Sequence, residues 1–122
     1  MAREGYPVTV FEALPVAGGM MAVGIPAYRL PRDILQSEIQ TIEELGVEIR
    51  TNTAIGPHPP HWGEKRGVGD LSLDDLRRDY DAVFVAVGAH GSRRLNIEGE
   101  HLAGVLHGVD FLRKVNLGRE VT

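Results

Sequence analysis

Hydrophobic positions in the first 50 residues follow a strand–helix–strand order. Residues 8–11 are β-branched and aromatic and end at Glu12, which is typical of a short strand. Residues 31–46 follow helical spacing, with a proline in the first turn, one apolar stripe and a glycine at the end. Residues 47–50 then alternate with a period of two, which predicts a second strand. This order predicts a βαβ unit with parallel pairing.

Three more elements are predicted in the second half. Ser72 and Asp75 form a capping-box pattern, so a short helix is expected over 73–79. Residues 81–88 are almost continuously apolar, which predicts a strand buried on both faces. Apolar residues at helical spacing over 109–115 predict a last amphipathic helix that ends near an asparagine and a glycine.

Two stretches show little periodicity. Residues 13–30 contain three glycines and two prolines and predict a long loop, and loops of that length in compact domains are usually functional or mobile. Residues 57–70 are rich in proline, glycine and histidine and predict an exposed loop. The whole chain, 1–122, is therefore expected to be one α/β domain or part of one.

Composition removes several classes of function. The net charge of −4 gives no basic face for nucleic acid. The absence of cysteine excludes disulfides, a cysteine-ligated zinc and an iron–sulfur cluster within this chain. No apolar run approaches the roughly 18 residues of a membrane span, and the N-terminus lacks a signal-peptide core. A cytoplasmic protein without a membrane partner is expected.

A few residues could carry chemistry, and each also has a plainer interpretation. Glu12, at the end of a strand in a βαβ unit, suits hydrogen bonds to ribose hydroxyls, or it is simply solvated. Gly18 and Gly19 would let backbone approach a pyrophosphate or a flavin, or they form an ordinary turn. Arg29 could reach a phosphate or pair on the surface, and Gly88 ends a strand at the edge where α/β sheets bind ligands.

A metal site is the weakest of these possibilities. His58 and His61 could ligate a metal ion, but no third or fourth ligand lies nearby in the sequence. No metal is therefore expected.

Taken together, the segments resemble the FAD-binding region of the glutamate synthase small-subunit family, which includes the flavin module of dihydropyrimidine dehydrogenase. The resemblance covers nearly the whole chain outside the loop at 57–69. It is carried by five blocks: Gly5-Tyr-Pro-Val-Thr-Val-Phe-Glu12, Gly18-Gly-Met20, Gly24-Ile-Pro-Ala-Tyr-Arg-Leu-Pro31, Tyr80-Asp-Ala-Val-Phe-Val-Ala-Val-Gly88 and Leu95-Asn-Ile-Glu-Gly-Glu100.

The resemblance implies a Rossmann-like FAD-binding fold with a short parallel sheet flanked by helices. It implies that electrons pass from NADH or NADPH through FAD to iron–sulfur clusters and a partner subunit, with the clusters and the nicotinamide site outside this chain. By motif position, Glu12 would hold the adenosine ribose and Ile55 would touch the adenine side through its backbone. The other implied cofactor contacts are Gly18, Gly19, Met20, Arg29, Val87 and Gly88. No catalytic side chain is expected, because the flavin supplies the chemistry.

The chain also departs from the family pattern. The family's first strand and its Gly-x-Gly-Pro-Ala-Gly turn have no counterpart here, so the expected fold is truncated and the isolated chain is expected to be inactive. Without that central strand, residues 8–11 and 82–87 are expected either to pair with each other or to form a homodimer through exposed strand edges. A cofactor-free α/β dimerisation or interaction module is the alternative function.

Overall fold

The chain, described for residues 1–56 and 70–121 in a computed structural model, divides into two units. The first unit comprises Met1–Ala17 and Gln36–Val87, and the second comprises Gly18–Leu35 and Gly88–Thr122. Each unit has its own small set of buried apolar side chains. Leu14, Ala54 and Leu76 are buried in the first unit, and Ala22, Val23 and Leu35 in the second.

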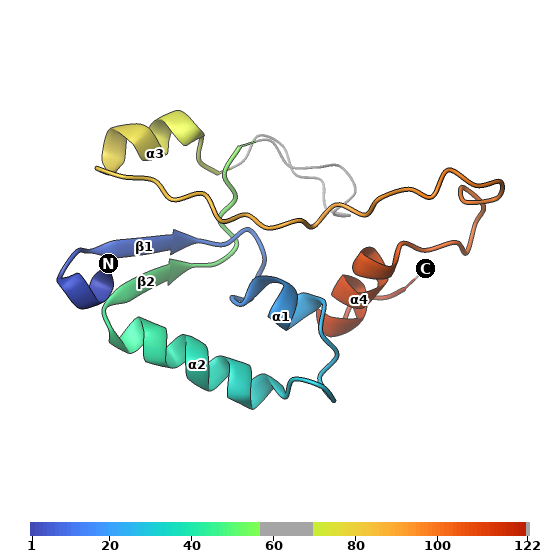
Figure 1. Ribbon diagram of the computed structural model, residues 1–122, viewed down its shortest axis with the longest axis horizontal. Coiled ribbons are helices and arrows are strands. Elements are labelled where there is room, and N and C mark those ends of the chain that lie inside the picture. Colours follow the sequence, from blue (N-terminus) through green and yellow to red (C-terminus); the bar gives the residue numbers. More distant parts are fainter. Residues whose placement is uncertain (57–69, 122) are drawn as a thin grey trace. The chain divides into compact units, whose positions relative to one another are not determined.

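The first unit contains the predicted parallel pair of strands. β1 (Val8–Phe11) pairs in parallel with β2 (Val47–Arg50) along its whole length (Figure 1). α2 (Arg32–Glu44) lies between them in the chain and ends just before Gly46, whose φ of 86° suits glycine and turns the chain into β2. Both strands, the helix and the parallel pairing are therefore confirmed. A short 3₁₀ turn, η1 (Ala2–Glu4), precedes β1.

Aromatic packing adds to this sheet. The rings of Phe11 and Tyr80 meet edge to face with centroids 5.9 Å apart. The Arg50 guanidinium lies 5.7 Å from the centroid of the Phe11 ring. The end of β1 is thus held by contacts to β2 and to the residue that follows α3 (Leu73–Asp79).

Helix α3 begins as the capping box predicts. The backbone N–H of Asp75 donates to Ser72 Oγ at 3.1 Å, and the Ser72 N–H donates to Asp75 Oδ2 at 2.9 Å. The helix therefore covers the predicted residues 73–79 because its first free N–H groups have side-chain acceptors.

Acidification should loosen the start of α3. The Ser72 hydroxyl, then the Ser72 N–H and Arg78, hold the pKa of the Asp75 carboxyl below its ordinary value. A lowered folded-state pKa stabilises the fold above the ordinary pKa of Asp, and this contribution is lost as the pH falls through the lowered value. In Ser72→Ala we expect the Asp75 pKa to rise and the loss to begin at higher pH. An NMR titration of the carboxyl checks this, with Ser37→Ala as control, and an unmoved pKa would contradict it.

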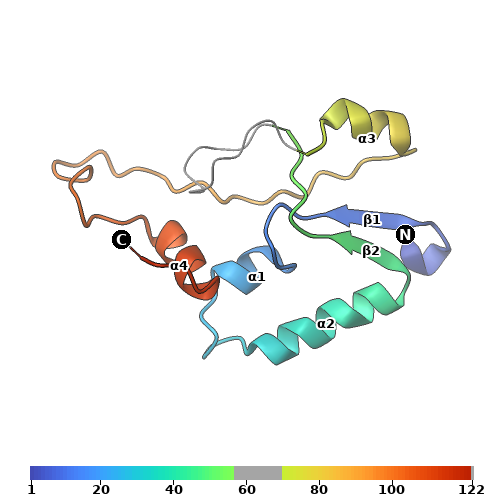
Figure 2. The same ribbon diagram turned by 180° about the vertical axis from the view of Figure 1, so that it is seen from behind.

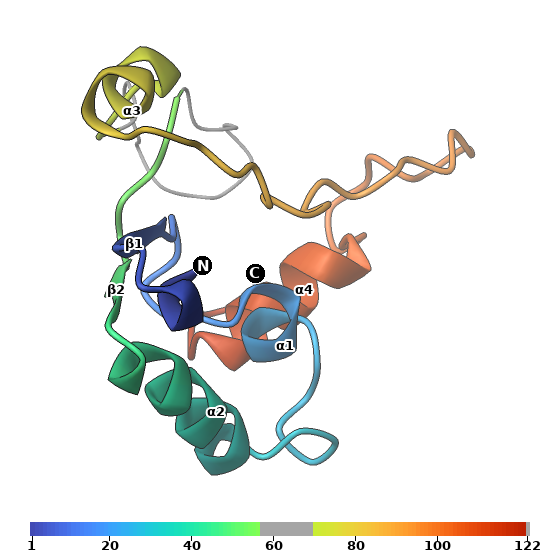
Figure 3. The same cartoon turned by 60° about the vertical axis from the view of Figure 1, so that its left-hand side comes forward.

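The second unit contains helices and no strand in its described residues. α1 (Gly19–Val23) lies beside α4 (Gly108–Asn116), as Figure 3 shows. α4 confirms the predicted last helix. α1 falls inside the stretch 13–30 that was predicted to be loop, so that prediction was wrong over these five residues. Among the described helices, none has the length and apolar content that a membrane crossing requires.

The predicted buried strand at 81–88 is absent. These residues carry no strand and join no ladder within the described ranges, where β1 pairs only with β2 (Figure 2). The side chains of Phe84, Val85 and Val87 are 89%, 67% and 76% exposed. The prediction failed because an apolar run becomes a buried strand only when other elements cover both of its faces. The expected pairing of 82–87 with β1 was also wrong.

Candidate functional site

Glu12 sits where the sequence predicts an acidic ligand, at the carboxyl end of β1. Its backbone continues the ladder, because its N–H donates to the Arg50 carbonyl and its carbonyl accepts from Thr53, both at 2.9 Å. Leu14 is buried, and its carbonyl accepts from Asn52 at 3.0 Å. Backbone bonds therefore hold this turn against the end of β2.

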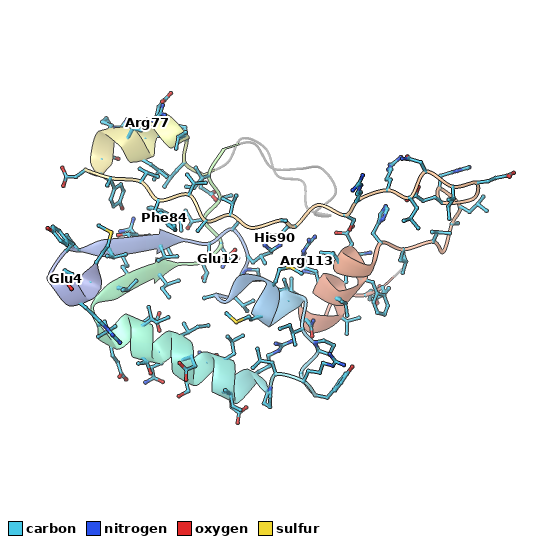
Figure 4. The ribbon with its side chains drawn as sticks, viewed as in Figure 1. Glu4, Glu12, Arg77, Phe84, His90 and Arg113 are labelled. Atoms are coloured by element: carbon cyan, nitrogen blue, oxygen red, sulfur yellow. The ribbon has the colours of Figure 1, made fainter. Side chains whose placement is uncertain are left out.

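One carboxylate oxygen of Glu12 is occupied by its own turn. The Leu14 N–H donates to Glu12 Oε1 at 2.8 Å, and no other hydrogen bond to this carboxylate exists in the part of the chain that the structure describes. The side chain is half-buried and projects from the end of β1, as Figure 4 shows. Since each carboxylate oxygen can accept about two hydrogen bonds, Oε2 remains available for a ligand's hydroxyl groups.

Ile55 offers backbone groups close to the same end of the sheet. It bridges Leu71 in parallel, and the bonds of this bridge run from Gly56 N–H to the Leu71 carbonyl and from Leu71 N–H to the Ala54 carbonyl. The N–H and C=O of Ile55 itself make no hydrogen bond within residues 1–56 and 70–121. A donor and an acceptor on one residue match the edge of an adenine ring, which has one nitrogen acceptor and an amino donor.

Gly18 and Gly19 form a turn that requires glycine. Their φ angles are 109° and 52°, and both lie in the left-handed region. A Cβ added to Gly19 would meet no atom within 4 Å, so open space lies beside this backbone. Met20 packs against Gly24 one turn later. The glycines thus lead directly into α1, and any cofactor contact that they make remains a prediction.

The arginine that binds the loop at 13–30 is Arg32, three residues after the predicted Arg29. The Arg29 side chain is exposed and makes no hydrogen bond or ion pair in the described residues, whereas the Arg32 guanidinium donates to the carbonyls of Met21 and Ile25 at 2.8 and 2.7 Å. Sequence reasoning missed Arg32. One signal was available, since a cation in the first turn of a helix opposes the helix dipole.

Val87 and Gly88 occupy the end of the exposed segment. Val87 is exposed, and Gly88 has a φ of 66°, a conformation that favours glycine. A Cβ at Gly88 would touch only the His90 ring, at 3.8 Å. Glycine is thus favoured at 88 by the positive φ of its backbone, and a side chain there would not clash with its neighbours.

Arg113 is a buried cation that sequence reasoning also missed. It is 6% exposed, and its guanidinium donates to Asp110 Oδ1 at 2.9 Å and to the His90 carbonyl at 3.0 Å. Figure 4 shows the two labelled residues, Arg113 and His90. A signal was available, because Arg113 lies four residues after Val109 and next to Leu112, on the helix face that the apolar spacing predicts to be buried.

The structure does not test the metal interpretation. His58 and His61 lie outside the described residues. Within the ranges that are described, no group of three His, Asp or Glu side chains could hold a metal ion.

Comparison with known proteins relates nearly all of this chain to one part of larger oxidoreductases. The chain is 53% identical over 121 residues to the beta subunit of an NADP(+)-dependent formate dehydrogenase from Moorella thermoacetica, covering 98% of this chain and 15% of that protein. It is 34% identical over 112 residues to the NADPH glutamate synthase small chain of Escherichia coli strain K12, covering 92% of this chain and 21% of that protein. No protein-family model matches.

A solved structure shows the same relation. A mutant of FprA from Mycobacterium tuberculosis matches with a TM-score of 0.69 and 31% identity, over 90% of this chain and 22% of that one. The chain thus spans between 15% and 22% of the length of these three proteins. It is similar along nearly its whole length to one segment of each of these larger proteins.

Proposed function

We propose that this chain is an FAD-contacting segment of an NAD(P)H-dependent flavin oxidoreductase. The observation that carries the proposal is Glu12. Its backbone is held by β2, its Oε1 is held by the Leu14 N–H, and its Oε2 is left as an acceptor at the carboxyl end of a parallel strand. Ligands of open α/β sheets bind at this end, and an acidic residue there accepts from ribose hydroxyls.

Ile55 fits the adenine of the same nucleotide. The carbonyl of Glu12 accepts from Thr53, and Ile55 follows two residues later. Ile55 therefore belongs to the segment that flanks Glu12, which suits groups that bind neighbouring parts of one adenosine. The N–H and C=O of Ile55 would then recognise the base edge while Glu12 binds the sugar.

The flavin would supply the redox chemistry, by accepting and releasing electrons. This chain's residues would bind and orient it. Gly18, Gly19, Met20, Arg29, Val87 and Gly88 are proposed as further contacts on the grounds of motif position. Open space beside Gly19 favours a cofactor contact there. The Arg29 side chain is exposed and is therefore also available for a cofactor contact.

The wider activity is also part of the proposal. Relatives named as NADP- or NADPH-dependent, and as beta subunits or small chains, support transfer of electrons from NADPH through FAD to a partner subunit. Iron–sulfur clusters would lie in other parts of such a protein, because this chain has no cysteine. A cytoplasmic location belongs to the same proposal.

The test is an FAD titration of the purified chain, followed by gel filtration with visible absorbance. We expect a flavin peak that migrates with the protein, and we expect AMP to compete, since it carries the adenosine that Glu12 and Ile55 would bind. A folded but colourless protein, shown by circular dichroism to retain its helices, would contradict FAD binding by this chain.

A second candidate function rests on the exposed apolar segment. Phe84, Val85 and Val87 are exposed side by side in the sequence, which favours an interaction module that pairs with a second copy. Light scattering should then give twice the mass of one chain, and Val85→Lys should return it to a monomer. Leu95→Lys, an exposed leucine elsewhere, is the control. A monomeric wild-type chain would contradict this function.

A further inference from the structure

Helix α1 is too short to hold its own position. It has only five residues, and isolated helices of fewer than about 12 residues are marginal in water. Its N-terminal end carries the Gly18–Gly19 turn, so whatever fixes α1 also fixes that turn. Besides the packing of its buried Ala22 and Val23, the hydrogen bonds that fix it come from its C-terminal end.

Two side chains from distant parts of the sequence bind the free carbonyls at that end. Arg32, the first residue of α2, donates to the carbonyls of Met21 and Ile25. Asn116, the last residue of α4, donates through Nδ2 to the Val23 carbonyl at 2.9 Å. The last carbonyls of a helix lack donors within the helix, so these bonds satisfy acceptors that the helix itself leaves unpaired.

The two side chains also bind each other. Arg32 donates to Asn116 Oδ1 at 2.8 Å, across 84 positions of sequence. Both are half-buried, which keeps water from competing freely. We call Arg32, Asn116 and the three carbonyls that they bind the α1 clamp. Val23, whose carbonyl Asn116 binds, is fully buried.

The placement of Arg32 favours a specific role. A positive charge in the first turn of α2 opposes that helix's dipole and costs stability there. The same charge lies against the C-terminal carbonyls of α1, where the dipole of α1 favours a cation. The cation thus occupies an unfavourable position on its own helix and stabilises the C-terminal end of another helix.

We propose that Arg32 and Asn116 are positioning residues, which hold α1 so that the Gly18–Gly19–Met20 segment is presented to the flavin. The part of this proposal that concerns the flavin rests on the proposed function. The part that concerns the position of α1 does not. The proposal makes cofactor affinity depend on the end of α4, where no cofactor contact is proposed. Substitution of Arg32 or Asn116 should therefore lower the affinity for FAD even though Arg29, Gly18 and Gly19 are left as they are.

Two variants test the clamp. Asn116→Asp keeps the acceptor for Arg32 and removes the donor to Val23, with almost no change of shape. Arg32→Met keeps the apolar stem and removes all three donated bonds. Arg93→Met, at an exposed arginine of the same unit, is the control.

The first readout needs no cofactor. Hydrogen exchange at the Gly24 and Ile25 amides, which donate to the Met20 carbonyl, should become about tenfold faster in both variants. Exchange at the β1–β2 ladder should stay unchanged, which shows that the chain is still folded. Exchange at Gly24 and Ile25 equal to that of wild type would overturn the proposal.

The second readout separates positioning from simple support of the fold. FAD affinity should fall about tenfold, and the visible circular dichroism of bound flavin should change, because the backbone beside the ring has moved. Faster exchange with unchanged affinity and flavin dichroism would overturn the positioning role. A wild-type chain that binds no FAD would overturn the proposed function instead, and the exchange result would still decide whether the clamp holds α1.

Discussion

Glu12→Ala is expected to weaken FAD binding about 150-fold, the largest effect that we expect from any single substitution. The substitution removes the acceptor for two ribose hydroxyls, and each charge-assisted hydrogen bond contributes about 1.5 kcal/mol or more. FMN has no adenosine, so its affinity should change little. The measurement is quenching of flavin fluorescence with FAD and FMN in parallel, on the wild-type chain and the variant.

Two controls define the role of Glu12. Glu12→Gln keeps an acceptor for the Leu14 N–H and loses the charge, so an intermediate affinity is expected. Glu4→Ala removes an exposed acid of the same unit and should have no effect. Equal loss of FAD and FMN binding in Glu12→Ala would show that Glu12 acts through the turn at Leu14, which would contradict ribose recognition.

Arg113→Met is expected to destabilise the second unit by about 2–3 kcal/mol. The guanidinium is buried and makes bonds to Asp110 and to the His90 carbonyl, and its removal leaves a partly buried carboxylate without its cation. Breaking a buried pair from one side costs up to about 5 kcal/mol, and the partial exposure of Asp110 places this pair at the lower end. Urea unfolding followed by circular dichroism should show a midpoint lower by about 1 M.

The matched variants separate charge from packing. Lys114→Met removes the neighbouring cation of α4 and should leave the midpoint almost unchanged. Adding Asp110→Asn to Arg113→Met removes the stranded charge and should recover part of the loss. No recovery in the double variant would show that the cost comes from lost packing of the arginine stem.

Elements with local signals were predictable from the sequence. β1, β2 and α2 follow hydrophobic periodicity, and α3 begins at a capping box whose two bonds span only Ser72 and Asp75. The position of Glu12 at a strand end was predictable for the same reason, since strand and turn signals lie within a few residues of it. In each case the groups that satisfy one another are close in the chain.

The remaining features depend on contacts between distant residues. The run at 81–88 has the composition of a buried strand, yet nothing in the sequence states whether a neighbouring strand will supply its hydrogen bonds, and the described chain supplies none. α1 exists as a placed helix because Arg32 and Asn116 meet across 84 positions. Arg113 is buried because the His90 carbonyl reaches it from outside its helix. Periodicity and caps report local bonds only, so the tertiary fold alone selects these partners and, with them, the helix that carries the Gly18–Gly19 turn.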